Sequence, residues 1–105
     1  MISRERIAEF GRLIADRFDP EKIILFGSHA YGKPGGDSDV DLLIVMPFNG
    51  SSHQMAVEIK SALPRPFPLD LLVRTPEELS KRMAMNDFFV KEIFERGIVL
   101  YERGN

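Results

Sequence analysis

The sequence contains no cysteine among its 105 residues. Disulfide bonds, thiolate metal sites and cysteine nucleophiles are therefore excluded, and this composition fits a reducing cytoplasm. No uninterrupted apolar run reaches the roughly 18 residues that a membrane span requires. The chain begins with a charged segment, Ser3 to Arg6, rather than an apolar one, so we expect a soluble, cytoplasmic protein without a membrane segment.

An excess of positive charge is also absent. Lysine and arginine together number 14 against 16 aspartates and glutamates, which gives a formal net charge of −2. Holding a long nucleic acid by counterion release needs a broad basic face, so an extended nucleic-acid surface is excluded. A chain of this length can enclose one hydrophobic core, and residues 1–105 are expected to form a single domain.

The apolar pattern alternates between the periods of helices and strands along the chain. Short apolar runs predict strands at residues 23–26, 40–46, 69–73 and 98–101, the last of them at a sheet edge. Helical spacing predicts helices at residues 4–18 and 51–63, from 76 onward and at 88–96, with a short helical turn at 28–32. This alternation predicts an α/β (α+β) domain in which helices pack on a small mixed sheet.

Capping residues set the boundaries of the predicted helices. Ser3, Ser51 and Thr75 each precede a helical pattern with a side-chain acceptor suited to the N-cap position. Asn86 or Asp87 can cap the last helix. We expect that helix to stop at residue 97, a glycine.

The most informative stretch joins the first two predicted strands. The first apolar run ends at Gly27 and Ser28, a glycine-rich loop follows, and Asp39 and Asp41 open the second run. Gly27 lacks a Cβ, so a phosphate can approach its backbone, while Ser28 offers a hydroxyl and the N–H groups of a helical turn. Side chains two apart on a strand project from the same face, which brings the two carboxylates together.

The two neighbouring carboxylates indicate a cation site. They repel each other unless a cation offsets their charge, and Mg²⁺ prefers carboxylates together with the oxygens of a substrate phosphate. Asp70 is the acidic residue inside the third apolar run, and strand pairing in register would place it on the same face. A metal ligand or a proton acceptor would explain a carboxylate at such a position. The pattern therefore predicts a nucleotide held by its phosphates on a metal.

A P-loop is one alternative interpretation of the glycine-rich stretch. Gly27, Gly32 and Lys33 match most of a Walker A pattern that follows a strand. Pro34, however, stands where that pattern needs a metal-binding serine or threonine, and proline has no N–H for the phosphate cradle. This substitution disfavours a P-loop.

A calcium-binding loop is the other alternative, because Asp37, Asp39 and Asp41 have the spacing of its first three ligands. Leu42 occupies the position of the required glycine, and Phe48 stands where a bidentate glutamate is needed. The sequence therefore excludes a loop of this kind.

The combined pattern resembles the signature of the polymerase-β-like nucleotidyltransferases, in particular the minimal bacterial ones. It consists of Gly27-Ser28, ten intervening residues, Asp39-Val40-Asp41 and, about thirty residues later, the strand-borne Asp70. The resemblance covers nearly the whole chain and implies the fold of that family. It also implies that Asp39 and Asp41 bind two Mg²⁺ ions. Asp70 would bind one of these ions or take the proton from the attacking hydroxyl.

The resemblance implies that one set of residues binds the nucleotide: Gly27, Ser28, Lys33 and Ser38. Many relatives carry arginines between the Gly-Ser pair and the next glycine. In this chain His29 and Tyr31 stand in that segment instead. Lys33 is a candidate for the missing charge, with a solvated loop lysine as the other interpretation.

The activity that the resemblance implies is Mg-dependent transfer of a nucleoside monophosphate, AMP from ATP, to a hydroxyl acceptor with release of pyrophosphate. Small stand-alone relatives pair with helical HEPN proteins. In such pairs the nucleotidyltransferase-like member serves as antitoxin and can transfer AMP to a tyrosine of its partner. The implied partners are thus a nucleoside triphosphate and either a HEPN-type protein or a second copy of the chain. The alternative is a non-catalytic module that binds a nucleotide or a partner and neutralises a toxin by contact.

Other residues have simpler interpretations. His29 and His53 are expected at the surface, and Arg74 is expected to be an ordinary loop charge. Core packing and a partner-binding patch are both open for six apolar residues near the C-terminus, with core packing expected for most of them: Met83, Met85, Phe88, Phe89, Ile93 and Phe94.

Overall fold

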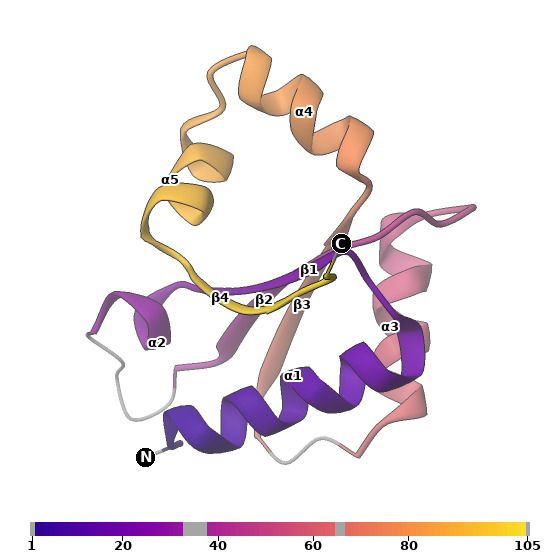
Figure 1. The fold of residues 1–105 in the computed structure, drawn as a ribbon, viewed down its shortest axis with the longest axis vertical. Helices are drawn as coiled ribbons and strands as arrows, with labels where there is room; N and C mark the ends of the chain where they lie inside the picture. The colour runs from indigo at the N-terminus through magenta and orange to yellow at the C-terminus, as the bar shows by residue number, and fades with distance from the viewer. Residues whose placement is uncertain (1, 33–37, 65–66, 105) are drawn as a thin grey trace.

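The computed structural model describes residues 2–32, 38–64 and 67–104. Nine elements follow one another within these ranges (Figure 1), and their bounds lie within one or two residues of those predicted. They are α1 (Arg4–Phe18), β1 (Lys22–Phe26), α2 (Ser28–Tyr31), β2 (Val40–Val45), α3 (Ser52–Ala62), β3 (Leu69–Arg74), α4 (Pro76–Ala84), α5 (Phe88–Arg96) and β4 (Ile98–Glu102).

The four strands form one mixed sheet in the order β3-β2-β1-β4. Strand β1 is antiparallel to both β2 and β4, whereas β2 and β3 are parallel. The predicted mixed sheet with helices packed on it is confirmed, as is the edge position of the last strand. Strand β2 is antiparallel to β1, and β3 runs in the same direction as β2. Both β2 and β3 therefore begin where β1 ends, at the edge of the sheet that is formed by strand ends.

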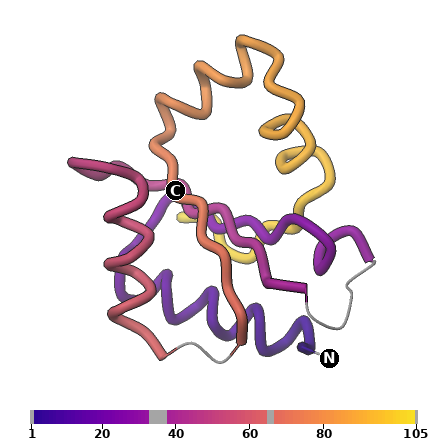
Figure 2. The backbone as a smooth tube through the Cα atoms, turned by 180° about the vertical axis from the view of Figure 1, so that it is seen from behind, coloured from indigo at the N-terminus to yellow at the C-terminus, as the bar shows by residue number. Residues whose placement is uncertain are grey.

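Helices cover both faces of this sheet. Figures 1 and 2 show α1 and α3 on one side and the α4–α5 pair on the other. Ile23 and Leu25 of β1 pack toward α1 and α3, while Ile24 and Phe26 belong to the apolar cluster beneath α4 and α5. Because β1 is buried on both faces, its sequence is a continuous apolar run and does not alternate between apolar and polar residues.

The side-chain caps predicted from the sequence are present. Ser3, Ser51 and Thr75 each accept a hydrogen bond from the backbone N–H three residues ahead, at 3.0–3.2 Å. Of the two candidates for the last helix, Asp87 is the cap, because its carboxylate accepts from the N–H groups of Phe89 and Val90.

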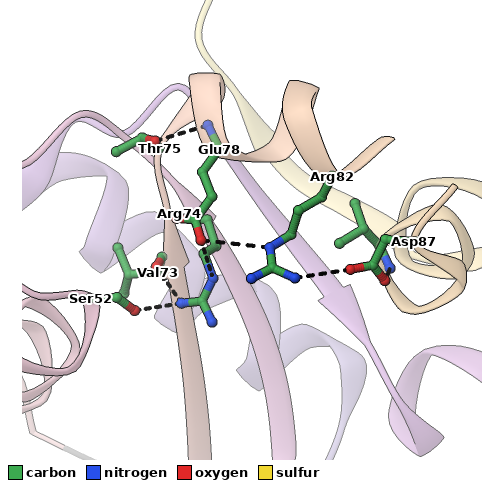
Figure 3. Close-up of polar contacts among 8 residues, drawn as sticks. Ser52, Val73, Arg74, Thr75, Glu78, Arg82 and Asp87 are labelled. Atoms are coloured by element: carbon green, nitrogen blue, oxygen red, sulfur yellow. Dashed lines mark hydrogen bonds and ion pairs between the residues drawn. The ribbon is translucent and has the colours of Figure 1, made fainter. Parts of the chain in front are cut away.

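Arg74 is not the ordinary loop charge that we predicted. It ends β3 and is half-buried, and its guanidinium donates to the Ser52 hydroxyl and to the Val73 carbonyl. Figure 3 shows that it also pairs with Glu78, which in turn pairs with Arg82. These contacts join α3, β3 and α4, so the arginine has a structural role.

Core packing was the wrong expectation for most of the apolar residues near the C-terminus. Only Ile93 of that set is buried, whereas Phe88 is 84%, Met85 70% and Phe89 53% exposed. These three residues, which we call the apolar tip, lie where α4 meets α5. The contact of Arg82 with Asp87 (3.1 Å) links the end of α4 to the first turn of α5 beside them (Figure 3).

No helix in the described part of the chain is long and apolar enough to cross a membrane.

Candidate functional site

The end of β1 and the beginnings of β2 and β3 meet at one edge of the sheet. Phe26 at the end of β1 is paired with Asp41, and Asp41 is paired in parallel register with Asp70. The register that we predicted for Asp70 is therefore present. Asp41 lies two positions before Leu43, and Asp70 two positions before Leu72, so each carboxylate shares the α4–α5 face of the sheet with that leucine.

Gly27 follows β1 and adopts a backbone conformation with φ 75° and ψ −162°. This region of conformational space is open essentially to glycine alone. A Cβ at this position would also collide with the carboxylate of Asp41. The turn after β1 therefore lies directly against the Asp41 carboxylate, which occupies the space beside the missing Cβ. Approach of a phosphate to the Gly27 backbone stays a prediction.

Ser28 begins α2, whose single turn is closed by hydrogen bonds from the N–H groups of Ala30 and Tyr31 to the Gly27 carbonyl, each 3.0 Å long. The predicted short helical turn is thus present. Ser38 and Asp39 lie just before β2, with Asp39 exposed. Lys33, the predicted phosphate contact, lies outside the described residues.

A cleft of about 370 Å³ opens at this edge of the sheet. Asp41 and Asp70 line it together with Gly27, and from α2 and α5 it is lined by Tyr31 and Glu92. Burial raises the pKa of Asp41, and the nearby carboxylates of Asp70 and Asp39 raise this pKa further. The folded chain therefore holds negative charge together at a cost, which a bound cation would offset.

The three carboxylates fit a divalent cation that prefers hard oxygen ligands. The carboxylates of Asp39 and Asp70 both act on Asp41, and all three side chains carry only oxygen donors, as Mg²⁺ prefers. No three histidine, cysteine or acidic side chains in the described ranges are already clustered closely enough to enclose a metal. The carboxylates can therefore hold a cation only together with further oxygens, such as those of a nucleotide phosphate or of water.

A larger cavity of about 680 Å³ lies at the other end of β1, between the sheet and the α4–α5 pair. Leu79 and Phe94 line it, and two of its charged groups, Lys22 and Glu102, pair with each other at 3.3 Å. Its described lining contains two carboxylates, those of Glu21 and Glu102, and Glu102 is the one that pairs with Lys22. Cavity size alone does not locate the chemistry in this molecule.

His29 is not at the surface, so that prediction is wrong. Its side chain is 8% exposed, and its Nε2 lies 3.1 Å from the carbonyl oxygen of Ser38. The guanidinium of Arg4 donates to the backbone carbonyl of His29 at 3.2 Å. One sequence signal pointed to His29, because this residue stands between Gly27-Ser28 and Asp39-Val40-Asp41. His53 is exposed, as predicted.

Helix α5 contributes residues that sequence reasoning missed. The Arg96 guanidinium lies over the ring of Tyr31, 4.2 Å from its centroid, and pairs with Glu92 at 3.4 Å. The pKa of Tyr31 is raised above its ordinary value, because burial raises it by more than a hydrogen bond with the Gly27 backbone lowers it.

Phe89 of the same helix packs edge-to-face on Phe26, with ring centroids 5.7 Å apart. No sequence signal connects these residues, since more than fifty positions separate α2 from α5.

Comparison with known proteins gives one family and two similar folds. A family model described as a nucleotidyltransferase domain matches residues 7–100. No protein of curated function matches the sequence. The crystal structure of a proposed nucleotidyltransferase from Sulfolobus solfataricus is similar, with a TM-score of 0.64 and 18% identity, covering 94% of this chain and 79% of that chain.

The second similar structure is a variant of the toxin–antitoxin pair MntA–HepT that carries two Asp-to-Glu substitutions two positions apart. Its TM-score is 0.56 at 17% identity, and the match covers 97% of this chain and 75% of that chain. At these identities the two structures establish a shared fold.

Proposed function

This chain belongs to the nucleotidyltransferase domain family, and we propose that it transfers a nucleoside monophosphate, AMP from ATP in the first instance, to a hydroxyl group of an acceptor. The observation that carries this proposal is the row formed across three strands by Phe26, Asp41 and Asp70. Gly27 at the end of this row lets the turn lie directly against the Asp41 carboxylate, because a Cβ here would collide with that group. A nucleotide phosphate and a cation can therefore meet at one point.

The proposed reaction is a displacement at the α-phosphorus of the nucleotide. The acceptor hydroxyl oxygen bonds to this phosphorus, the bond from the phosphorus to the oxygen that bridges to the β-phosphorus breaks, and pyrophosphate leaves with the electron pair. Asp70 is exposed at the cleft and either accepts the hydroxyl proton or adds a ligand to the metal. Gly27, Ser28 and Ser38 are the described residues that we assign to binding of the triphosphate.

Asp39 and Asp41 are the residues that would hold Mg²⁺, with Asp70 as the third carboxylate. When bound, such ions neutralise charge on the transferred phosphoryl group and on the leaving oxygen. The raised pKa of Asp41 supports this assignment, because its cause is burial beside like charges rather than an existing ion pair.

For the acceptor we propose a tyrosine of a helical HEPN-type partner, with this chain as the antitoxin of the pair. The support is the fold shared with the MntA–HepT pair, whose two Asp-to-Glu substitutions have the spacing of Asp39 and Asp41. The cleft at the carboxylates has a volume of only about 370 Å³, which leaves most of the acceptor surface to another molecule. We further propose that residues 1–105 form one folding unit and that the protein acts in the cytoplasm.

The experiment is label transfer from ATP that is radioactive at the α-phosphate, with Mg²⁺ and the protein encoded by the adjoining reading frame as acceptor. The wild type is compared with Asp39→Asn plus Asp41→Asn. A charge-matched control, Glu9→Gln plus Asp16→Asn, changes two exposed acids of α1. We expect transfer by the wild type and the control and none by the site variant. Absence of transfer by the wild type, with equal acceptor binding by all three proteins, would contradict enzymatic function.

A specific observation favours a second candidate function, a module that neutralises a protein partner by binding alone. The apolar tip exposes Phe88 and Met85 on an ordered turn held by Asp87 and Arg82, and Phe89 extends it to the cleft. Preorganised exposed aromatic residues are typical anchors of protein interfaces. The occupant we propose is an apolar face of the same partner protein.

This second candidate is tested by titrating the adjoining gene product with Phe88→Ser and with a matched variant, Val57→Ser. Val57 is 47% exposed on α3, on the other side of the sheet. Binding weakened only by the Phe88 substitution supports the tip as the interface. Equal binding by both variants, or self-association lost by Phe88→Ser in light scattering, would contradict it.

A further inference from the structure

His29 is the only polar or charged side chain that is buried in the described ranges of the chain. Burying an imidazole is unfavourable unless its polar atoms find partners. The partner of Nε2 is a carbonyl oxygen, that of Ser38, and a carbonyl can only accept. The Nε2 atom therefore carries the hydrogen and donates it, which leaves this nitrogen without a lone pair for a metal or a substrate.

The hydrogen bond lies just beyond the end of the strand ladder. Pairing between β1 and β2 stops at Phe26 and Asp41. Asp39 precedes β2, so no strand pairing positions it. On its C-terminal side, the Val40 N–H donates to the Pro68 carbonyl at 3.0 Å. On its N-terminal side, the Ser38 carbonyl accepts from His29 at 3.1 Å. Asp39 is thus held between two hydrogen-bonded neighbours.

The other end of this contact is also anchored. His29 lies in α2, directly after Gly27 and Ser28, and its own carbonyl accepts from Arg4 of α1 at 3.2 Å. The imidazole therefore links a turn that is fixed to α1 and β1 with the segment that carries Asp39. The two halves of the proposed site are joined by this side chain outside the sheet.

We propose that His29 is a positioning residue that holds Asp39 at the correct distance from the Gly27–Ser28 turn, so that one metal–nucleotide complex can contact both. This inference rests on the proposed function of the site. A metal–nucleotide complex would need Asp39 and the Gly27–Ser28 turn in place at the same time. A nucleotide without metal would need only the turn. Outer-shell partners of this kind change metal affinity by about 10–100-fold when removed.

The test compares His29→Leu, which keeps apolar bulk without a donor, with His29→Gln, whose amide nitrogen can reach the place of Nε2. His53→Leu removes an exposed histidine of α3 and is the matched control. The probes are Mn²⁺ followed by electron paramagnetic resonance and ATP followed by calorimetry, with and without metal. For His29→Leu we expect Mn²⁺ affinity in the presence of ATP to fall by about 10–100-fold. Metal-free ATP binding should stay unchanged.

His29→Gln should recover most of the lost Mn²⁺ affinity, and His53→Leu should behave as the wild type. Equal Mn²⁺ affinity of His29→Leu and the wild type would overturn the proposal. So would a glutamine variant as weak as the leucine variant, because the hydrogen bond would then not be the cause.

Amide hydrogen exchange separates this inference from the proposed function. We expect the Val40 amide, one residue from Asp39, to exchange faster in His29→Leu than in the wild type at equal global stability. If the wild type binds no Mn²⁺ with ATP, the proposed function fails, and the exchange rate still reports whether His29 holds this segment. An unchanged Val40 exchange rate would overturn the positioning role by itself.

Discussion

At the scale of single residues, the site depends on a close approach between a glycine and a carboxylate. Gly27 follows β1 and Asp41 lies in the adjacent strand β2, and the missing Cβ of the glycine provides the space for the carboxylate. The charged form of Asp41 is disfavoured, because this side chain is partly buried and lies near the carboxylates of Asp70 and Asp39. The proposed site therefore imposes a cost in folding stability at Gly27 and at Asp41.

Gly27→Ala should both destabilise the fold and remove metal-dependent nucleotide binding. The strained backbone region costs on the order of 1–3 kcal/mol for a residue other than glycine, and the new Cβ would displace the Asp41 carboxylate. Gly50→Ala is the control, since Gly50 also has a positive φ, 87°, but lies away from the site. Urea unfolding and ATP titration with Mg²⁺ measure the two effects. Equal nucleotide binding by both variants would show that the close approach is unimportant.

Asp41→Asn should raise the melting temperature of the ligand-free protein at pH 7 while it abolishes transfer. The substitution removes a charge that burial and the carboxylates of Asp70 and Asp39 disfavour in the folded state. Asp16→Asn, at an exposed position of α1, should change neither property appreciably. Scanning calorimetry with the label-transfer assay checks both. A lower melting temperature for Asp41→Asn would contradict the electrostatic account.

At the scale of elements, α5 completes the cleft through its attachment at both ends. Its N-terminus is capped by Asp87, and its C-terminus is followed by Gly97, which packs against β1. Between these ends Glu92 reaches the cleft, and Arg96 covers Tyr31 of α2. The position of the helix therefore decides which side chains face the carboxylates.

Gly97→Ala should destabilise the protein by roughly 1–3 kcal/mol, the usual cost of overpacking. An added Cβ would meet the carbonyl of Ile93 and the side chain of Ile24, neither of which has room to move. Gly104→Ala is the control, because nothing lies near its Cβ position. Denaturant unfolding measures the difference between the two variants. Similar midpoints would mean that α5 can move away from β1 without loss.

The cap of α5 should make stability depend on acid. Hydrogen bonding to the Val90 N–H, the Arg82 side chain and the Phe89 N–H lowers the pKa of Asp87 below its ordinary 3.8. A lowered folded-state pKa contributes stability above 3.8 that is lost as the pH falls through the folded value. Asp87→Asn keeps an acceptor without this titration, so its stability relative to the wild type should improve at low pH. Urea unfolding between neutral and acidic pH checks this, and parallel curves would contradict it.

At the scale of the whole molecule, the sheet brings distant segments to one edge. The cleft collects residues from the end of β1, from α2, from β2 and β3 and from α5. The apolar tip adjoins the cleft, because Phe89 belongs to both. A ligand that bridges these segments should therefore stabilise the entire fold.

A non-hydrolysable ATP analogue with Mg²⁺ should raise the melting temperature strongly. A ligand at 100 times its dissociation constant adds about 2.7 kcal/mol to the free energy of unfolding. For a domain of this size that corresponds to a shift of about 10–20 °C. The shift should shrink when EDTA removes the metal, and it should shrink to the same extent in Asp39→Asn plus Asp41→Asn, where EDTA should have no further effect. An equal shift with and without metal would contradict a metal–nucleotide site.

The amino-acid sequence alone was sufficient for the elements and for the nucleotidyltransferase family. Caps such as Ser3 and Thr75, apolar periodicity and the spacing of Asp39 and Asp41 act over a few residues, so they can be recognised locally. The tertiary structure decided which segments became neighbours. It paired Asp70 with Asp41, buried His29 against Ser38, brought α5 to the cleft and left the apolar tip exposed. These outcomes depend on contacts between residues far apart in the chain, because strand pairing and helix packing minimise the free energy of the whole fold.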